Sequence, residues 1–476
     1  MAEPARFDFK QNIAKALKDN QLRNNLRSAM DGLRVKRQDV FDDALELEEL
    51  RRYGNAVKER ALSRLPQLLE QLEQKCTQNG IQVHWAETTD EANHIVLEIL
   101  QRHKATLLVK GKSMVSEEMH LNRFLARHGI EALETDLGEF IIQLDGETPS
   151  HIIVPAVHKN KDQIARTFHA KIPGAPYTED VEALNRIARA TLREKFKAGH
   201  AGLSGVNFAV AETGTLCLVE NEGNGRMCTT VPPVHIAVMG IEKVVEKLEE
   251  IPPLLRLLTG SATGQRITTY FNMITSPRNP GEKDGPLEVH LILLDNGRSR
   301  IYADPKLRQT LYCIRCGTCL NHCPVYTRLG GHAYGFLYPG PIGKILMPQI
   351  EGLPAAGDLA TASTLCNACE EVCPVRIPIP TLIRRVRNES YDASDAAAMP
   401  GHGYRRNLME IITWKTWALV NSRPALNRLI IKLAGRLGRL MPAIGPLKAW
   451  TQVRSRPRFA PKSLHQLIRE KGVPND

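Results

Sequence analysis

The sequence has no long hydrophobic run: no stretch of 18 consecutive apolar residues occurs in its 476 residues. A helix needs about 20 apolar residues to cross a bilayer, so we expect no transmembrane helix. The first residues, MAEPARFDFKQNIAKAL, also lack the apolar core and the small-residue cleavage site of a signal peptide. These absences predict a cytoplasmic protein.

Common cofactor and catalytic motifs are also missing. There is no GxGxxG fingerprint, no Walker loop and no HExxH pair, and the histidines at 151, 158, 235 and 290 have no triad-like arrangement. We therefore expect no flavin or nicotinamide site in this chain and assign no catalytic residue from the sequence.

The length and the pattern of elements predict several domains, because 476 residues exceed one ordinary core. Short apolar runs alternate with helical stretches between about residues 81 and 295, which indicates an α/β sheet. A capping box at Thr88 and Glu91 predicts a helix start. We divide the chain into a helical cap (1–75), an α/β domain (76–300), a cysteine-rich helical domain (301–390) and a basic helical region (391–476). The strands expected in the first half of the α/β domain are 81–85, 107–110, 130–134 and 151–157, with a helix from Ser116 to about His128.

The cysteines are unevenly distributed. Ten are present, and seven of them lie between residues 313 and 373. A reducing cytoplasm does not favour disulfides, so this cluster of thiols predicts a metal site. Of the remaining three, Cys217 lies in an apolar strand pattern and is expected to be a small buried residue.

The spacing within the cluster is that of iron–sulfur proteins. The motifs are Cys313-x2-Cys316-x2-Cys319-x3-Cys323-Pro and Cys366-x2-Cys369-x3-Cys373-Pro. In a bacterial run of this kind the fourth cysteine ligates the other cluster. We therefore predict a first cluster on Cys313, Cys316, Cys319 and Cys373, and a second on Cys323, Cys366 and Cys369. Four thiolates also suit zinc, but a zinc ribbon shows two separated cysteine pairs instead.

One ligand position of the second site is not a cysteine. Ser363 stands three residues before Cys366, where a full motif would have its first thiol. Three outcomes are open: a three-iron cluster, a four-iron cluster with the Ser363 oxygen or water on its fourth iron, or a four-iron cluster completed by a partner or substrate. Arg315 and Arg376 lie in or beside the motifs. Nearby cations raise the potential of a cluster; the alternative is two solvated arginines with no such role.

The α/β domain offers weaker signals. Gly111 to Glu118 follows a strand and opens a helix, so Lys112 and the small residues beside it could contact an anion there; an ordinary capped turn is the alternative. Glu212 to Thr215 and Asn221 to Arg226 could form the rim of a pocket, with tight turns as the alternative. If this pocket binds an organic acid, we take Lys112, Ser113, Glu212 and Arg226 as candidate contacts.

The positive charge of the chain is concentrated at its C-terminus. Residues 381–476 contain 18 Lys or Arg and 6 Asp or Glu, a net of +12 against +11 for the whole chain. The region has no helix-turn-helix pattern, and Trp414, Trp417 and Leu429 favour helices that dock on a partner. We expect no nucleic acid partner, although a basic patch does bind polyanions; the mixture of basic and apolar residues also permits peripheral contact with the cytoplasmic face of a membrane.

Taken in order, the segments VKGKSMVSEE, NFAVAETGTLCLVENEGNGRMCTT, CIRCGTCLNHCPVY, GGHAYGFLYPGPIG and STLCNACEEVCPVRIP resemble lactate utilization protein B over about residues 5–400. This family is the iron–sulfur subunit of the three-component lactate utilization system of bacteria. The resemblance implies a lactate-utilization domain, similar to the CoA-transferase and ribose-phosphate-isomerase type of fold, followed by a helical ferredoxin domain with two [4Fe-4S] clusters. It also implies electron transfer in the oxidation of L-lactate to pyruvate, with A and C components as partners. A substrate-binding catalytic subunit for another small organic acid and a redox-sensing regulator are the alternatives.

Overall fold

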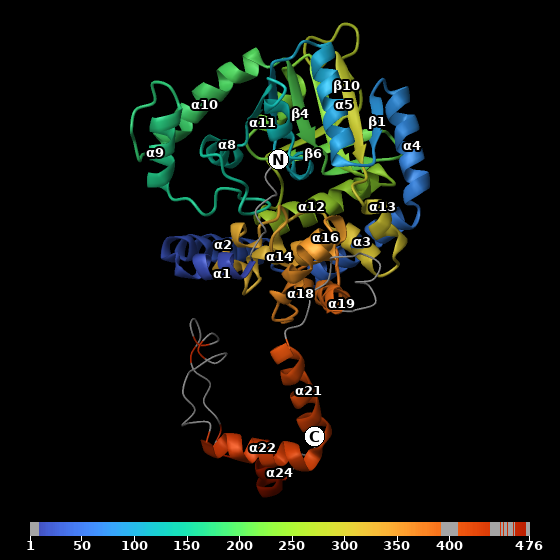
Figure 1. Cartoon of the computed structure of the whole chain (residues 1–476). Coiled ribbons are helices and arrows are strands. Elements are labelled where there is room, and N and C mark those ends of the chain that lie inside the picture. Colours follow the sequence, from blue (N-terminus) through green and yellow to red (C-terminus); the bar gives the residue numbers. More distant parts are fainter. Residues whose placement is uncertain are drawn as a thin grey trace. The chain divides into compact units, whose positions relative to one another are not determined.

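The computed structural model describes residues 9–391, 408–437, 448, 451, 455, 460 and 462–472. The chain forms two compact units, residues 1–404 and 405–476. Figure 1 shows the elements of both units.

A parallel sheet of six strands is the centre of the first unit. Its strands, in spatial order, are β1 (Gln82–Ala86), β10 (Glu288–Leu294), β7 (Val234–Gly240), β4 (Ala201–Gly205), β2 (Leu107–Lys110) and β3 (Glu131–Glu134). The chain passes from β2 outward to β3 and then returns to β4 on the other side of β2. The strand order therefore reverses at β2 and β4, and open α/β sheets bind ligands at the carboxyl ends of such a pair.

Both faces of this sheet are buried, which explains its nearly continuous apolar strands. On β10, Ile292 and Leu294 pack in one core, whereas Leu291 and Leu293 pack in another on the opposite face. The helices of this region are α5 (Thr89–Arg102), α6 (Met114–Glu118), α7 (Leu121–Ala126), α8 (Leu137–Leu144), α9 (Lys161–Lys171), α10 (Val181–Ala198), α11 (Asn224–Thr230) and α12 (Ile251–Ala262), with short 3-10 turns η1 (Ile241–Lys243) and η2 (Leu248–Glu250). Helix α11 lies so close to β4 that a Cβ on Gly202 would be 1.8 Å from the carbonyl oxygen of Cys228.

A second, smaller sheet has four strands in the order β8 (Val244–Val245), β5 (Phe208–Val210), β6 (Thr215–Glu220) and β9 (Tyr270–Ile274). Strand β6 is antiparallel to both β5 and β9.

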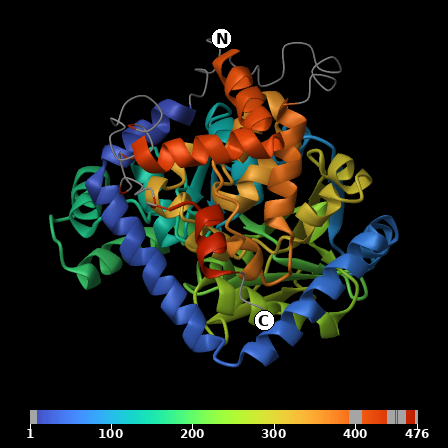
Figure 2. The same cartoon turned by 90° about the horizontal axis from the view of Figure 1, so that it is seen from below.

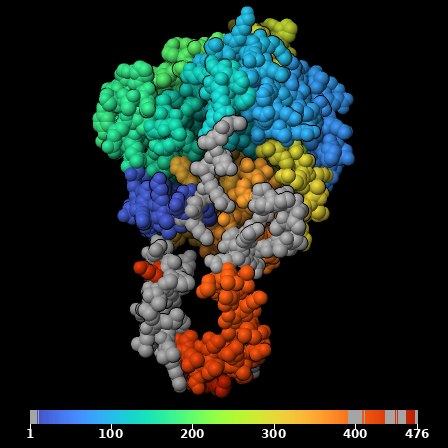
Figure 3. All heavy atoms as spheres, in the orientation of Figure 1, coloured from blue at the N-terminus to red at the C-terminus, as the bar shows by residue number. Residues whose placement is uncertain are grey.

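Helices from both ends of the first unit form the layer that contains the cysteine motifs. The N-terminal helices of this layer are α1 (Phe9–Lys18), α2 (Asn20–Val40) and α3 (Ala44–Ser63). Helix α4 (Leu65–Gln78) follows them but packs against β1 and β8 of the α/β layer. The later ones are α13 (Arg298–Ala303), η3 (Leu307–Tyr312), α14 (Thr318–Asn321), α15 (Tyr326–Leu329), η4 (His332–Tyr334), α16 (Gly340–Ile350), α17 (Leu353–Ala356), η5 (Gly357–Thr361), α18 (Ala368–Glu371) and α19 (Ile379–Tyr391). Helix α2 contacts α14 and α15, and α3 contacts η3, so the blue helices in Figure 2 flank the orange cysteine segments. Figure 3 shows the two layers of this unit in contact, with the α/β residues in cyan and green and the helical layer in dark blue and orange.

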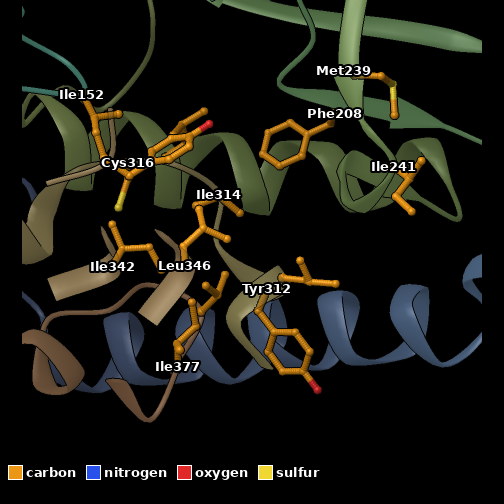
Figure 4. Packing of buried hydrophobic residues seen from close by; sticks show 14 of the residues in the cluster. Ile152, Phe208, Met239, Ile241, Tyr312, Ile314, Cys316, Ile342, Leu346 and Ile377 are labelled. Carbon is orange, nitrogen blue, oxygen red and sulfur yellow. The ribbon is translucent and has the colours of Figure 1, made fainter. Parts of the chain in front are cut away.

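The core continues from the sheets into the helical layer. Figure 4 shows Phe208 of β5 and Met239 of β7 on one side of this core, and Ile377 and Ile342 on the other. Cys316 lies among these apolar side chains. The cysteine layer is thus packed against the α/β layer and shares one core with it.

The structure confirms the capping box of Thr88 and Glu91, but two expected elements are wrong. Residues 151–157 form bends and turns instead of a strand, because His151 Nδ1 accepts hydrogen bonds from the amides of Ile153 and Val154 and so curls the backbone. The helix expected from Ser116 to His128 is broken at His120, whose φ is 50°.

The described residues of the second unit are mainly helical, with α21 (Leu408–Ser422), α22 (Pro424–Leu437) and α24 (Leu464–Lys471). Trp414 and Trp417 on α21 pack edge to face and are both more than half exposed. Part of the region predicted to be basic and helical lies outside the described residues. Among those that are described, no helix is both long and apolar enough to cross a membrane.

Candidate iron–sulfur centre

Four cysteines from the two sequence motifs line one cavity in the helical layer. They are Cys313, Cys316, Cys319 and Cys373, and the walls around them are largely apolar, with Ile152, Ile342 and Ile377 among them. The backbone amides of Arg315 and Ile377 donate to Cys313 Sγ and Cys373 Sγ, each at 3.4 Å. Amide N–H groups aimed at sulfur stabilise a thiolate.

The three remaining motif cysteines line a second cavity. Cys323, Cys366 and Cys369 are joined there by Ser363 and by the side chain of Lys344. Tyr326 N–H donates to Cys323 Sγ at 3.5 Å, and Lys344 Nζ lies 3.7 Å from the same sulfur. The fold thus brings the seven cysteines together in the two sets that their spacing suggested.

The two motifs have the same backbone conformation. In the first, Arg315 and Gly317 on either side of Cys316 have φ values of 61° and 73°. In the second, Leu365 and Asn367 on either side of Cys366 have φ values of 52° and 64°. Non-glycine residues rarely adopt positive φ, so its use at matching positions shows that the chain turns in the same way around Cys316 and around Cys366.

Ser363 occupies in the second motif the place that Cys313 has in the first. Ser363 Oγ accepts a hydrogen bond from the amide of Leu365 at 3.2 Å, as Cys313 Sγ does from Arg315. Its side chain also lines the second cavity. The hydroxyl oxygen is therefore placed where a fourth thiolate would stand.

These donor sets fit iron–sulfur clusters. All the motif cysteines except Cys313 and Cys366 are buried, and none forms a disulfide. Burial raises the pKa of the Cys316, Cys319 and Cys373 thiols above its usual range. Without a nearby positive charge, these buried thiols would stay protonated. A bound metal ion supplies that charge and stabilises the thiolate form.

Three cations that lie near the motifs have different roles. Arg315 is 8% exposed and lines both the first cysteine cavity and a larger cavity beside it. Arg376 points away, with Nε 3.5 Å from Glu48 and a side chain 45% exposed. The third, Lys344, was missed by the sequence analysis; it is 1% exposed within the apolar helix α16, and its ammonium lies 5.6 Å from the Tyr334 ring centre. A lone lysine in an apolar helical run was the signal that could have identified it.

The larger cavity, of about 360 Å³, lies at the carboxyl edge of the parallel sheet. Its lining includes Gly111, Lys112 and Ser113 after β2, Gly205 at the end of β4 and Asn207 beyond it, and Lys243 after β7. It also includes Arg315 and Tyr338 from the cysteine layer. This volume is within the usual range of small-molecule sites.

The candidate pocket residues are only partly brought together. Lys112 and Ser113 line this cavity, but Lys112 Nζ donates to the Ile153 carbonyl at 2.8 Å, and Ser113 Oγ accepts from the Ser116 amide. Glu212 does not line it, since its carboxylate accepts from the Leu248 amide. The guanidinium of Arg226 stacks on Tyr270 at 5.6 Å instead. The sequence analysis missed Asn207, Lys243 and Tyr338, which reach the cavity only through the tertiary fold.

The other three cysteines have a structural role. Cys76, Cys217 and Cys228 are buried in separate places, and burial raises the pKa of each thiol to about 12. The expectation that Cys217 is a buried small residue is confirmed, since it lies inside β6 with no exposure.

An α/β domain packed on a helical layer with two cysteine-lined cavities defines an iron–sulfur protein of the electron-transfer class. The chain matches the LUD domain family over residues 69–294 and the 4Fe-4S dicluster domain over residues 309–377. It matches Lactate utilisation protein B, C-terminal, over residues 385–473. Similar proteins include lactate utilization protein B of Bacillus licheniformis, which is 40% identical over 94% of both chains. The Bacillus subtilis protein of the same name is 38% identical over 94% of this chain and 93% of its own.

This chain belongs to the lactate utilization protein B family. An Escherichia coli relative described as an uncharacterized electron transport protein, YkgF, is 45% identical over 80% of both chains. A solved structure of a DUF162 family protein from Deinococcus radiodurans overlaps 48% of this chain and 98% of its own, with a TM-score of 0.29 and 14% identity.

Proposed function

We propose that this protein is the iron–sulfur electron-transfer subunit of a multicomponent system that oxidises L-lactate to pyruvate. The observation that carries the proposal is the pair of cysteine-lined cavities in one chain of this family. Oxidation of a 2-hydroxy acid to a 2-oxo acid releases two electrons and two protons, and iron–sulfur clusters carry electrons singly. A chain with two clusters is thus suited to pass on the electron pair.

The first cluster is assigned to Cys313, Cys316, Cys319 and Cys373, and the second to Cys323, Cys366 and Cys369. Both are [4Fe-4S] clusters in this proposal, with Ser363 at the fourth iron of the second. The support for Ser363 is its Oγ, which accepts from an amide as Cys313 Sγ does. The buried ammonium of Lys344 beside Cys323 favours the reduced, more negative state of the second cluster, which raises its potential.

The partners in this proposal are the A and C components of the lactate utilization system. The exposed Trp414 and Trp417 on α21 support a docking role for the C-terminal unit, because exposed aromatic residues are enriched at protein interfaces. Peripheral contact with the cytoplasmic face of a membrane is the second role that we propose for this basic region.

The similarity of the α/β domain to the CoA-transferase and ribose-phosphate-isomerase type of fold is likewise proposed from the family.

The proposal is tested on the full chain purified without oxygen. We expect iron and sulfide for two clusters, and electron paramagnetic resonance signals after dithionite reduction that show coupling between them. The chain alone should oxidise lactate poorly, and addition of the A and C components should restore electron transfer to an artificial acceptor. Zinc in place of iron, or rapid lactate turnover by the chain alone, would contradict the role as an electron-transfer subunit.

A further inference from the structure

The cavity at the carboxyl edge of the sheet shares a wall with the first cysteine site. Arg315 and Ile152 line both spaces. Arg315 lies between Cys313 and Cys316 in the sequence, and its backbone amide donates to Cys313 Sγ. A molecule in the larger cavity would therefore be separated from the first cluster by little more than one side chain.

The cavity contains cationic groups whose hydrogen-bonding capacity is not used up. Arg315 Nη2 donates to Glu242 Oε1 at 3.2 Å, but Arg315 Nη1 is buried with no hydrogen-bond partner. An unpaired buried donor of a charged group is costly, so a ligand atom at this place is expected. Lys243, which is 7% exposed, also lines the cavity. Burial lowers the pKa of its ammonium to about 7, so an anion bound beside it would favour the charged form.

The acidic residues of the lining accept hydrogen bonds from backbone amides, which hold their carboxylate oxygens in place and stabilise the charged form. Glu220 accepts from the amides of Gly225 and Arg226 at 2.7 and 2.6 Å. Glu222 accepts from the amide of Leu137, and Asp136 from those of Gly138 and Glu139. Burial also raises the pKa of Glu222 to about 7, which reduces its negative charge near neutral pH.

The available donors suit a carboxylate better than a phosphate group. Phosphate sites usually use the free amides at a helix start, but here Glu220 takes those of α11 and Ser113 Oγ caps α6. What remains is the Nη1 group of Arg315, the Lys243 amine and one side-chain amide. The Asn207 Oδ1 atom accepts from Val219 N–H at 2.9 Å, so its Nδ2 group is left to donate into the cavity. Leu218 and Leu258 supply an apolar wall for a short alkyl group.

We propose that this cavity binds the substrate of the system, a small 2-hydroxy or 2-oxo carboxylic acid, with its carboxylate on Arg315 and Lys243 and its second oxygen on Asn207. This inference rests on the proposed function and adds to it a substrate site in the iron–sulfur subunit itself. The volume exceeds that of a three-carbon acid, so water fills the remainder.

The test is isothermal titration of the full, cluster-loaded chain with L-lactate and pyruvate, and separately with inorganic phosphate. The key variant is Asn207→Asp, which keeps the acceptor for the Val219 amide but places a negative oxygen where the ligand would bind. We expect binding to weaken roughly 10- to 100-fold, the effect of losing a hydrogen bond to a charged group. Lys243→Met should have a similar effect. The matched control is Asn160→Asp, the same chemical change at the N-cap of α9, where Asp caps as well as Asn.

Iron and sulfide contents of the same samples separate the two proposals. Full clusters without heat from either acid would overturn the substrate site and leave the electron-transfer role intact. Absence of clusters would instead overturn the electron-transfer role. Binding of phosphate in place of the acids would overturn the carboxylate assignment, and binding that Asn207→Asp and Asn160→Asp affect equally would overturn the location.

Discussion

At the scale of single residues, one serine distinguishes the two cysteine sites. Its oxygen stands where the first site has the Cys313 sulfur, and both accept a hydrogen bond from the amide two residues later. A neutral hydroxyl donates less electron density to iron than a thiolate. The fourth iron of the second cluster is therefore expected to be held more weakly than the other three.

Substitution Ser363→Cys should complete the second site. We expect air-exposed wild-type protein to lose the weakly held iron and show a three-iron signal by electron paramagnetic resonance, and the variant to lack this signal. The added thiolate should also lower the reduction potential of the second cluster. Ser363→Ala is the control and should lose the iron at least as readily as the wild type. Identical spectra and potentials for wild type and Ser363→Cys would show that residue 363 does not face the cluster.

At the scale of elements, a buried ionic network joins the α/β layer to the cysteine layer. Arg298 at the start of α13 makes a bidentate pair with Glu118 of α6 at 2.8 and 2.9 Å. Its Nε donates to Glu242 of η1 at 2.6 Å, and Glu242 also accepts from Arg315 in the first cysteine motif. Burial alone would raise the pKa of Glu242, but Arg298 and Arg315 hold it down to about 2.

Substitution Glu242→Gln should destabilise the first unit by about 3–5 kcal/mol, because Arg315 loses its carboxylate partner and Arg298 keeps only that of Glu118. The lowered pKa means that this carboxylate stabilises the fold fully above the unfolded pKa of about 4.3, and that the contribution is lost as the pH falls toward 2. Thermal unfolding at pH 7 checks the first effect, and a series of melting curves from pH 5 down to about pH 3 checks the second. Glu249→Gln is the control, since that side chain is 74% exposed, and equal melting temperatures for the two variants would contradict the network.

At the scale of the whole molecule, the chain separates into a unit that contains both cysteine sites and a C-terminal unit that contains none. The apolar side chains of α21 are largely exposed, including Leu408, Trp414 and Trp417. A folded chain rarely leaves such a group uncovered without a partner surface. We therefore propose that the first unit carries the electrons and that the C-terminal unit docks on a partner.

A chain that ends at residue 404 should keep the iron and sulfide of both sites but lose association with its partners. Co-purification with the A and C components measures binding to protein partners. Flotation with anionic liposomes measures binding to a membrane. Whichever partner is lost on truncation is the one that the C-terminal unit binds. Retention of both would show that the first unit does the docking, and loss of iron would show that the units are not independent.

The sequence by itself determined the chemistry of the metal centre and much of the α/β pattern. Cysteine spacing is a local property, because a two-residue spacer reaches the same compact cluster in any fold, and the capping box at Thr88 and Glu91 likewise depends on four consecutive residues. Only the tertiary structure decided which distant residues meet. Lys243 and Asn207 come from different strand ends, and Arg315 from the cysteine layer, yet they line one cavity. Such contacts depend on sheet order and on packing between layers, and neither leaves a periodic signal in the sequence. The segment from His151 is a second example: its sequence suggested a strand, but hydrogen bonds to the His151 side chain make it a turn.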